Sequence, residues 1–341
     1  MDRTPVEESV VSKKLKALPV ITDERPWLFS VAAVGIGVVT SLQSRVNGLL
    51  SVNLSNGVHA AMVSYCVGLV FMLVLVIFLP RLRHGLSLLP GALRNGDLSW
   101  WQMSGGAIGG FFVAAQSMAV PVAGVTTFAV AVITGQIASS LFVDKVGLGP
   151  AGKQAVTSRR LLAAFVALVA VALTSFHRLT VHGHVSVIVI LLAFAAGFLI
   201  AFQQAFNAKV GEVSGSVSSA TTLNSALGTL VLCTAFGVSV IFFDQRVDIW
   251  PLGPVWIYAG GILGLVSIAG AVLVVTRIGV LAFTLLLIAG QLVGALLLDL
   301  LVPAEGFVMT WALVLGMLLA FIAVKISSLG TRRSKAEPIL G

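Results

Sequence analysis

Residues 41–48 read SLQSRVNG, and residues 201–208 read AFQQAFNA, 160 positions later. Both stretches lie toward the end of a long apolar run, and both carry glutamine and asparagine four residues apart. Positions i and i+4 share one face of a helix, so each pair forms a polar stripe on an otherwise apolar helix. A repeated stripe of this kind predicts both a duplicated fold and a functional site.

The composition places the chain among helical membrane proteins. It has 341 residues, of which 58% are hydrophobic and 10% charged, far outside the range of soluble domains. Apolar runs of about 18 or more residues recur along it, each long enough to cross about 30 Å of hydrocarbon as an α-helix. These runs do not alternate as barrel strands do. We expect an all-α membrane protein with ten transmembrane helices, at 28–47, 58–79, 101–120, 125–143, 161–177, 185–207, 218–242, 256–275, 279–298 and 308–326.

Two registers of internal similarity divide the chain into halves. An offset of 160 aligns the two amide pairs. An offset of 155 aligns residues 105–110 (GGAIGG) with 260–265 (GGILGL), and 135–144 (GQIASSLFVD) with 290–299 (GQLVGALLLD). Ordered matches of glutamine and aspartate are much rarer by chance than matches of leucine or valine. Because each half holds five spans, an odd number, the second half enters the membrane from the opposite side, as in inverted-repeat transporters.

The distribution of basic residues predicts the orientation in the membrane. Of the 21 Lys and Arg, 18 fall on one side of the expected spans, two on the other, and Arg45 lies within a span. Basic loops stay in the cytoplasm, so we expect a multi-pass protein of the cell membrane with both termini cytoplasmic. The expected segments are a cytoplasmic tail at 1–26, a five-helix repeat at 27–177, an extracytoplasmic connection at 178–184, a second repeat at 185–326, and a cytoplasmic tail at 327–341.

In these features the chain resembles the drug/metabolite transporter superfamily. The resemblance is carried by ten helices in two inverted halves, a Gln-x-x-x-Asn in each first helix and a Gly-Gln in each fourth helix. Within the superfamily the chain is similar to the YdcZ-like branch, many of whose members are single five-helix units. The resemblance implies a ten-helix bundle around a central cavity, lined mainly by the first, third and fourth helices of each half. Two fused halves would replace the dimer of the shorter members.

Amides within the spans are the candidate lining of that cavity. Gln136 and Gln291 fall near the middle of their spans, each directly after a glycine. An amide that faces lipid leaves donors and acceptors unpaired, so these side chains must face protein or water. Hydrogen bonding between helices, worth about 0.6–2 kcal/mol per contact, is the alternative to a cavity role. The candidates are Gln136, Gln291, Gln43, Asn47, Gln203 and Asn207.

Charged residues near the span ends form a second set of candidates. Asp144 and Asp299 end the fourth helices of the two halves and are candidate gate or proton sites, although polar residues are common at helix ends. No Asp or Glu falls in mid-span, where proton-coupled exporters of cations commonly need a buried carboxylate. Arg45 can either snorkel to the outer interface or attract an anionic substrate, and its counterpart Ala205 gives no support for a core role.

Other kinds of site find little support in the sequence. Cys66 and Cys233 lie inside apolar spans and lack the spacing of a metal or redox motif. The histidines at 177–184 are unaccompanied by carboxylates or thiols, which favours a solvated loop over a zinc site. The glycines of 105–110 and 260–265 allow close helix packing, and no Lys-Ser or Lys-Thr follows them as in a phosphate loop.

Together these patterns predict a secondary transporter that moves a small organic solute or metabolite by alternating access. The alternatives are a non-transporting membrane scaffold or sensor, and a lipid-handling membrane protein. An amide-lined cavity suits a neutral, zwitterionic or weakly charged solute. We expect no enzymatic activity, no cofactor and no metal. The expected partners are the solute and membrane lipids, without nucleic acid, and the chain is expected to act as a monomer because it contains both halves.

Overall fold

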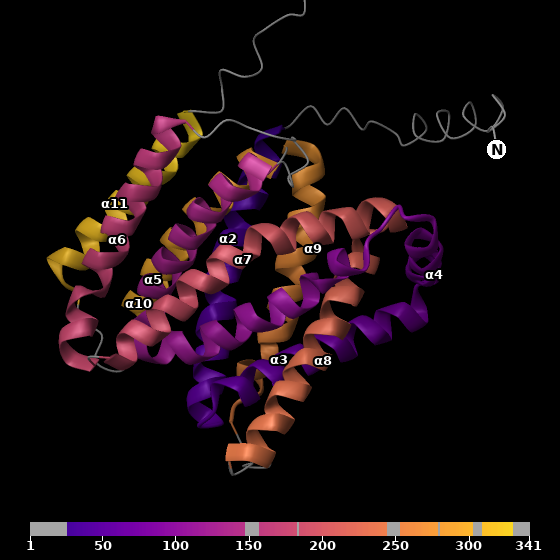
Figure 1. The fold of residues 1–341 in the computed structure, drawn as a ribbon. Helices are drawn as coiled ribbons and strands as arrows, with labels where there is room; N and C mark the ends of the chain where they lie inside the picture. The colour runs from indigo at the N-terminus through magenta and orange to yellow at the C-terminus, as the bar shows by residue number, and fades with distance from the viewer. Residues whose placement is uncertain are drawn as a thin grey trace, which may run out of the picture.

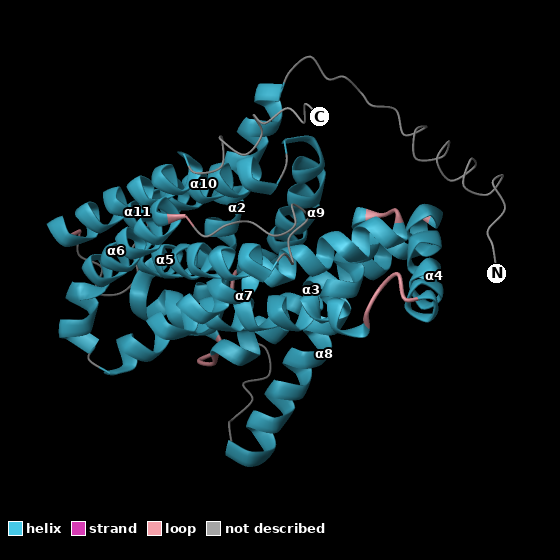
Figure 2. Cartoon of the chain, turned by 45° about the horizontal axis from the view of Figure 1, so that its top comes forward, coloured by secondary structure: helices cyan, strands magenta, loops and turns pink. Residues whose placement is uncertain are grey.

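The computed structural model of the chain describes residues 26–146, 157–182, 184–243, 253–278, 280–302 and 309–329. Within these residues the secondary structure is helical and no strand is present (Figure 2). The long helices are α2 (Pro26–Asn53), α3 (Gly57–Phe78), α4 (Pro80–Asn95), α5 (Gly105–Val146), α6 (Ser158–His182), α7 (His184–Ser214), α8 (Val217–Phe243), α9 (Gly260–Ile278), α10 (Val280–Leu301) and α11 (Trp311–Leu329). Two short 3-10 helices, η1 (Trp100–Ser104) and η2 (Val255–Ala259), precede α5 and α9.

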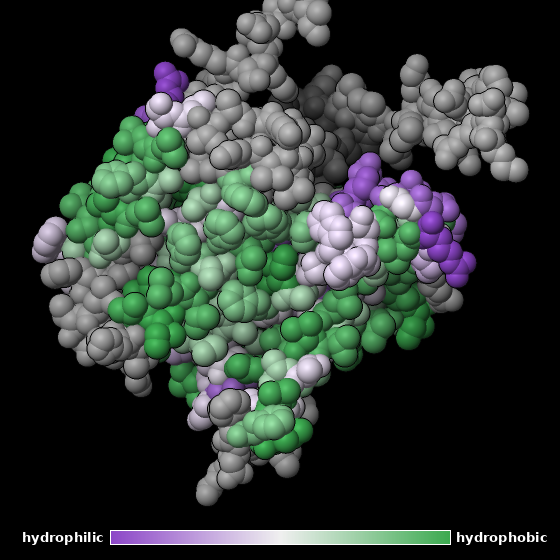
Figure 3. Space-filling view, in the orientation of Figure 1, coloured by the Kyte–Doolittle hydropathy of each residue, from purple (hydrophilic) through white to green (hydrophobic). Residues whose placement is uncertain are grey.

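The surface of the helix bundle is that of a protein immersed in lipid. Apolar side chains cover most of the face seen in Figure 3, and Phe78, Ile241 and Leu301 are 74–77% exposed. Surface of this kind is costly in water but not in hydrocarbon. The described stretches long and apolar enough to cross a membrane are Trp27–Asn53, Gly57–Phe78, Trp100–Ser139, Val187–Ser214 and Val217–Phe242, with shorter apolar stretches at Leu161–Ala170, Val255–Ala271, Leu286–Leu301 and Trp311–Ile326. The protein is therefore a multi-pass membrane protein.

Helix α5 is a hairpin rather than one straight rod. Gly124 interrupts it with φ 78° and ψ 163°, a backbone conformation that is open almost only to glycine. The ring centroids of Phe112 and Phe128 lie 5.9 Å apart, whereas the 16 positions between them would span about 24 Å of straight helix. The two segments, 105–123 and 125–146, therefore fold back on each other, and they correspond to the expected spans 101–120 and 125–143.

The two sequence halves interleave instead of forming separate bundles. Helix α2 packs against α9 and α10 of the second half, and α7 packs against both segments of α5 in the first half. The pairs α3–α8 and α6–α11 also join the halves, and α6 and α11 lie side by side in both views (Figures 1 and 2). Most of the buried interior thus lies between the halves.

Helix α4 occupies a stretch that we expected to be a loop between two spans. Pro80 starts the helix and Gly96, with φ 79°, follows its end, which are the favoured places for these two residues. Leu89 and Ala92 pack against Val210 of α7. The helix is too short and too polar for a span, so the search for long apolar runs missed it. Hydrophilic surface gathers around it (Figure 3).

Candidate functional site

The first Gln-x-x-x-Asn stripe lies on a glycine-lined face of the other half. A Cβ atom on Gly264 of α9 would lie 2.9 Å from Nε2 of Gln43, and one on Gly260 would collide with Oδ1 of Asn47. The residue numbers rise along α2 while they fall along α9, so the helices are antiparallel and both use a four-residue spacing. We call the contact of α2 with α9 and α10 the first seam.

The second stripe repeats this arrangement. A Cβ atom on Gly109 of α5 would lie 2.5 Å from Nε2 of Gln203, and one on Gly105 would lie 2.5 Å from Oδ1 of Asn207. We call the contact of α7 with the two segments of α5 the second seam. The glycines that the sequence marked for close packing therefore have a defined partner, since each half presents a Gly-x-x-x-Gly to the amide stripe of the other half.

The two stripes differ in how their polar atoms are satisfied. In the second seam, Nδ2 of Asn224 on α8 donates to Oδ1 of Asn207 over 3.3 Å. In the first seam, Asn47 is fully buried, and neither Nδ2 nor Oδ1 has a hydrogen-bond partner in the protein. The position equivalent to Asn224 is Ser64, whose shorter side chain also has a buried, unpartnered oxygen.

Gln136 and Gln291 hold equivalent places in the two seams. They are 7% and 6% exposed, and Oε1 of each lacks a hydrogen-bond partner. A Cβ atom on the glycine before each would collide with the backbone of the facing helix, which is α7 for Gly135 and α2 for Gly290. The Gly-Gln motif therefore brings a buried amide to the place where the backbones of the two halves approach most closely.

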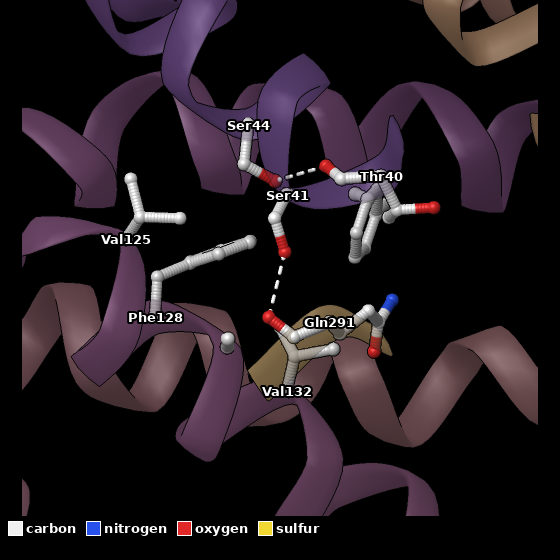
Figure 4. A pocket seen from close by; sticks show the side chains of 9 residues that line it. Thr40, Ser41, Ser44, Val125, Phe128, Val132 and Gln291 are labelled. Carbon is white, nitrogen blue, oxygen red and sulfur yellow. Dashed lines mark hydrogen bonds between the residues drawn. The ribbon is translucent and has the colours of Figure 1, made fainter. Parts of the chain in front are cut away.

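A small cavity lies beside Gln291 (Figure 4). Its free volume is about 10 Å³, close to what a single water molecule needs. Ser41 Oγ donates to the backbone oxygen of Gln291 over 2.8 Å at its edge. The other five candidate amides do not line this cavity, whose lining consists of Thr40, Ser41, Ser44, Phe112, Val125, Phe128, Ala129, Val132 and Gln291.

Asp299 is buried at the break in α5 and is 1% exposed. Its carboxylate accepts hydrogen bonds from the backbone amides of Val125 over 3.0 Å and of Thr126 over 2.7 Å. These are the first amides of the second α5 segment, and amides at a helix N-terminus have no partner within their own helix. A carboxylate there satisfies both donors and interacts favourably with the helix dipole.

Arg45 lies inside the protein at the same place. Its side chain is 6% exposed, and it interacts electrostatically with Asp299. Attraction of an anionic substrate and snorkelling to the outer interface both stay open as roles for Arg45. The counterpart of Arg45 in the second half is the apolar Ala205.

Two buried polar residues of α5 escaped the sequence analysis. Gln116 and Ser117 are fully buried, and neither the amide atoms of Gln116 nor the hydroxyl of Ser117 has a hydrogen-bond partner. Their counterparts in the second half are Ala271 and Val272. The prediction of site residues rests on residues shared by the two halves, and this polar pair is present in only one of them. Their place inside the expected span 101–120 is the signal that could have revealed them.

Some candidates fall outside the described part of the chain. The side chains of Asp144 and of the histidines at 177–184 are among them, although the backbone of His182 ends α6 and that of His184 begins α7. Among the described residues, no group of three or more His, Cys, Asp or Glu side chains is placed to hold a metal ion.

The comparison with known families agrees with this duplicated architecture. A model of the family described as "Putative inner membrane exporter, YdcZ" matches residues 28–173 and again residues 188–326. The chain belongs to this family. Two successive matches confirm the prediction of two fused YdcZ-like halves, and each match covers one half of the interleaved bundle. No match was found among curated proteins.

Proposed function

We propose that the protein is a secondary transporter that moves a small organic solute across the membrane by alternating access between its two halves. The observation that carries this proposal is the set of buried polar atoms without partners in and beside the seams, on Asn47, Gln116, Gln136 and Gln291. A buried polar group without a partner costs about 1–3 kcal/mol. Groups of this kind in a membrane protein favour a path that water or solute fills in another conformation.

The pattern of contacts supports an inverted repeat of ten transmembrane helices. The contact of Gly37 with Leu287 has its counterpart in that of Gly197 with Val132, at the two offsets found in the sequence. The seams thus share this packing contact, which is consistent with alternating access by rocking of two equivalent halves. In this proposal both termini are cytoplasmic and the 178–184 connection is outside. Reporter fusions to the C-terminus test this orientation. An extracellular signal would contradict a cytoplasmic C-terminus.

The family description supports export as the direction of transport. A cavity lined by hydroxyls and an amide suits a neutral, zwitterionic or weakly charged solute. We propose no catalytic role for these residues. The candidate gates are Asp299 and, at the opposite end of the repeat, Asp144.

Substitution of the two central glutamines tests the site. Solutes are first identified by comparing metabolite export from cells with and without the protein. Gln136→Ala and Gln291→Ala should then lower export several-fold while expression and thermal stability stay near those of the original chain. Gln204→Ala, a change of the same kind at a partly exposed site on α7, serves as the control and should have little effect.

The scaffold alternative has one observation in its favour. The bond between Asn224 and Asn207 is the interhelical contact that a purely structural role predicts. If both glutamine variants unfold without a selective loss of export, the amides join helices and the site is elsewhere. Labelling of a cysteine distinguishes a solute pathway from a purely structural role, and it does not require the solute to be known. A cysteine at position 291, in a chain lacking Cys66 and Cys233, should react with a charged thiol reagent added to either side of the membrane.

A further inference from the structure

Three hydroxyl groups on α2 line the cavity beside Gln291, and each of them donates its proton to a backbone oxygen. Thr40 donates to Ile36 over 2.9 Å. Ser44 donates to Thr40 over 3.0 Å, and Ser41 donates to Gln291 over 2.8 Å (Figure 4). A serine or threonine hydroxyl has one proton and two lone pairs. Toward the cavity these three oxygens therefore offer lone pairs only.

Gln291 adds a fourth oxygen to this set. Its side chain is 6% exposed, and its Oε1 has no hydrogen-bond partner in the protein. The hydroxyl of Ser267 lies 3.3 Å from Thr40 Oγ1, which leaves that oxygen one further lone pair. Among the described side chains that line the cavity, only the Gln291 amide still has protons to donate, and none carries a charge. The cavity thus has a surplus of acceptors.

A surplus of oxygen acceptors in a closed space favours a cation. Divalent hard cations usually take carboxylates among their ligands, and transition metals prefer imidazole or thiolate groups. The cavity is lined by none of these. Neutral oxygens that replace the hydration shell are typical ligands of alkali ions. The free volume of about 10 Å³ is enough for one particle of the size of a water molecule.

The surroundings of the cavity stabilise a positive charge. A buried cation is unfavourable unless negative groups lie nearby. The backbone amide of the lining residue Val125 donates to the carboxylate of Asp299 over 3.0 Å, so a buried anion lies directly behind the cavity wall. Phe112 and Phe128 also line the cavity, and the face of an aromatic ring attracts cations. Arg45 of α2 is not among the lining residues.

The oxygen atoms come from both halves of the chain. The three hydroxyls lie on α2 and Gln291 lies on α10, so these groups meet across the first seam. Coupling ions of secondary transporters bind at the interface between the repeats. In the second seam the counterparts of Thr40 and Ser41 are the apolar Ile200 and Ala201. Movement of the halves would therefore assemble and dismantle one such site.

We infer that this cavity binds a sodium ion, and that entry of sodium drives export of the solute. The inference rests on the proposed transport function and names its coupling ion. The sodium gradient of cells points inward and the potassium gradient outward, so sodium suits the export that the family description supports. Since the cavity has room for one particle of this size, ion and solute exclude each other, which gives exchange rather than cotransport.

Thermal unfolding of the full-length protein in lipid nanodiscs tests the ion site. Sodium chloride replaces choline chloride at constant chloride, and potassium chloride and methylammonium chloride are the other arms. Sodium should raise the unfolding temperature with saturation, and the other two cations should act only at far higher concentrations. Gln291→Leu removes an oxygen at nearly constant volume and should abolish the sodium shift. Gln291→Glu adds an anion at the same place and should lower the half-saturating sodium concentration about tenfold.

The matched control is Gln136→Leu, the same change at the equivalent amide of the second seam, which should leave the half-saturating sodium concentration unchanged. Loss of the sodium shift in this variant as well would place the ion elsewhere and overturn the inference. Equal unfolding temperatures of the original chain in sodium and in choline would show that the cavity holds only water. This result overturns the inference without any variant, so a poorly folding variant does not protect it. Equal stabilisation by potassium, or stabilisation by methylammonium alone, overturns the assignment of sodium.

Flux measurements in proteoliposomes separate the ion site from the transport function. Release of solute from loaded vesicles should be several-fold faster into sodium chloride than into choline chloride. Release at the same rate in both salts overturns the coupling and leaves the transporter standing. Saturable sodium binding without flux of any solute leaves the ion site and removes the transporter.

Discussion

The first and second seams share one scaffold and differ in their chemistry. In both, a Gln-x-x-x-Asn faces a Gly-x-x-x-Gly and a Gly-Gln packs on the first helix of the other half. In the first seam neither polar atom of the Asn47 side chain has a hydrogen-bond partner. In the second seam Asn207 is bonded to Asn224. Duplication has thus preserved the packing, while the hydrogen bonding of the two asparagines differs between the seams.

The positions equivalent to the cavity lining also differ between the two seams. Thr40 and Ser41 of the first seam correspond to Ile200 and Ala201 of the second. The hydroxyls that border the cavity are therefore absent from the second seam at these positions. A symmetric scaffold allows both conformations of a rocking bundle to form, whereas an asymmetric lining lets the solute bind more tightly in one of them, which is what directional coupling needs.

The largest expected effect on stability comes from substitution of the buried Asp299. Asp299→Ala should destabilise the protein by about 2–6 kcal/mol, since it leaves two buried helix amides, those of Val125 and Thr126, without their acceptor. Asp97→Ala, at an exposed carboxylate, should be close to neutral. Denaturant unfolding of the purified protein measures both. Equal effects of the two single aspartate variants would show that Asp299 contributes nothing to the first seam.

The next effect tests the shared scaffold, where the seams should respond alike. Gly37→Ala and Gly197→Ala each place a methyl group against a backbone carbonyl, of Leu287 and Val132 respectively. Each should lower the free energy of unfolding by about 1–3 kcal/mol through overpacking. Gly35→Ala, two residues from the first site, meets no atom within 4 Å and should be neutral or slightly stabilising. A large loss at one site beside a negligible loss at the other would mean that the packing of the seams is not duplicated.

Much of this scaffold could be predicted from the sequence because it follows from hydrophobic length and from repetition. The spans coincide with described helices, and the glycines and amides of the repeat meet across the seams. Helix α4 was missed since it is amphipathic and short. Of the site, the burial of Gln136 and Gln291 was expected from the unfavourable free energy of an amide in lipid. A repeat alone could not reveal Gln116, whose counterpart is Ala271.

The capping contact of Asp299 could not be predicted for a different reason. The sequence predicts Asp299 as the end of a helix and a candidate gate, but the amides that it binds lie more than 170 residues away, in the other half. A repeat aligns equivalent positions, whereas this contact joins positions that are not equivalent. Only the fold brings them together, and it shows that Asp299 caps a different helix.

A smaller effect distinguishes the two asparagines. Asn207→Ala removes a bonded partner of Asn224 and should cost about 0.6–2 kcal/mol of stability. Asn47→Ala removes a buried amide that has no partner, so its stability should be unchanged or higher while export falls. The matched change Ser64→Asn gives Asn47 the partner that Asn207 already has, and should stabilise the protein by about 1 kcal/mol. Unfolding and export are measured for each variant. Equal losses of stability at positions 47 and 207 would show that the two asparagines contribute alike and that the seams do not differ in this respect.

The last prediction concerns a contact between the halves outside both seams, and it should leave stability almost unchanged. Cys66 on α3 and Cys233 on α8 are partly buried and exposed, respectively, and the two helices pack against each other. Cysteines that face each other on packed helices can be joined with little backbone movement. Copper phenanthroline as the oxidant should therefore link them, which is detected on a gel after a protease site inserted at 178–184 is cut. The halves should stay joined in the oxidised protein and separate after reduction, and Cys66→Ser should abolish the link.

Because a disulfide between α3 and α8 ties the halves together, export should also slow under oxidation in the original chain and not in the variant. Continued export at full rate by linked protein would mean that α3 and α8 move as one body and that the rocking occurs within the two seams alone.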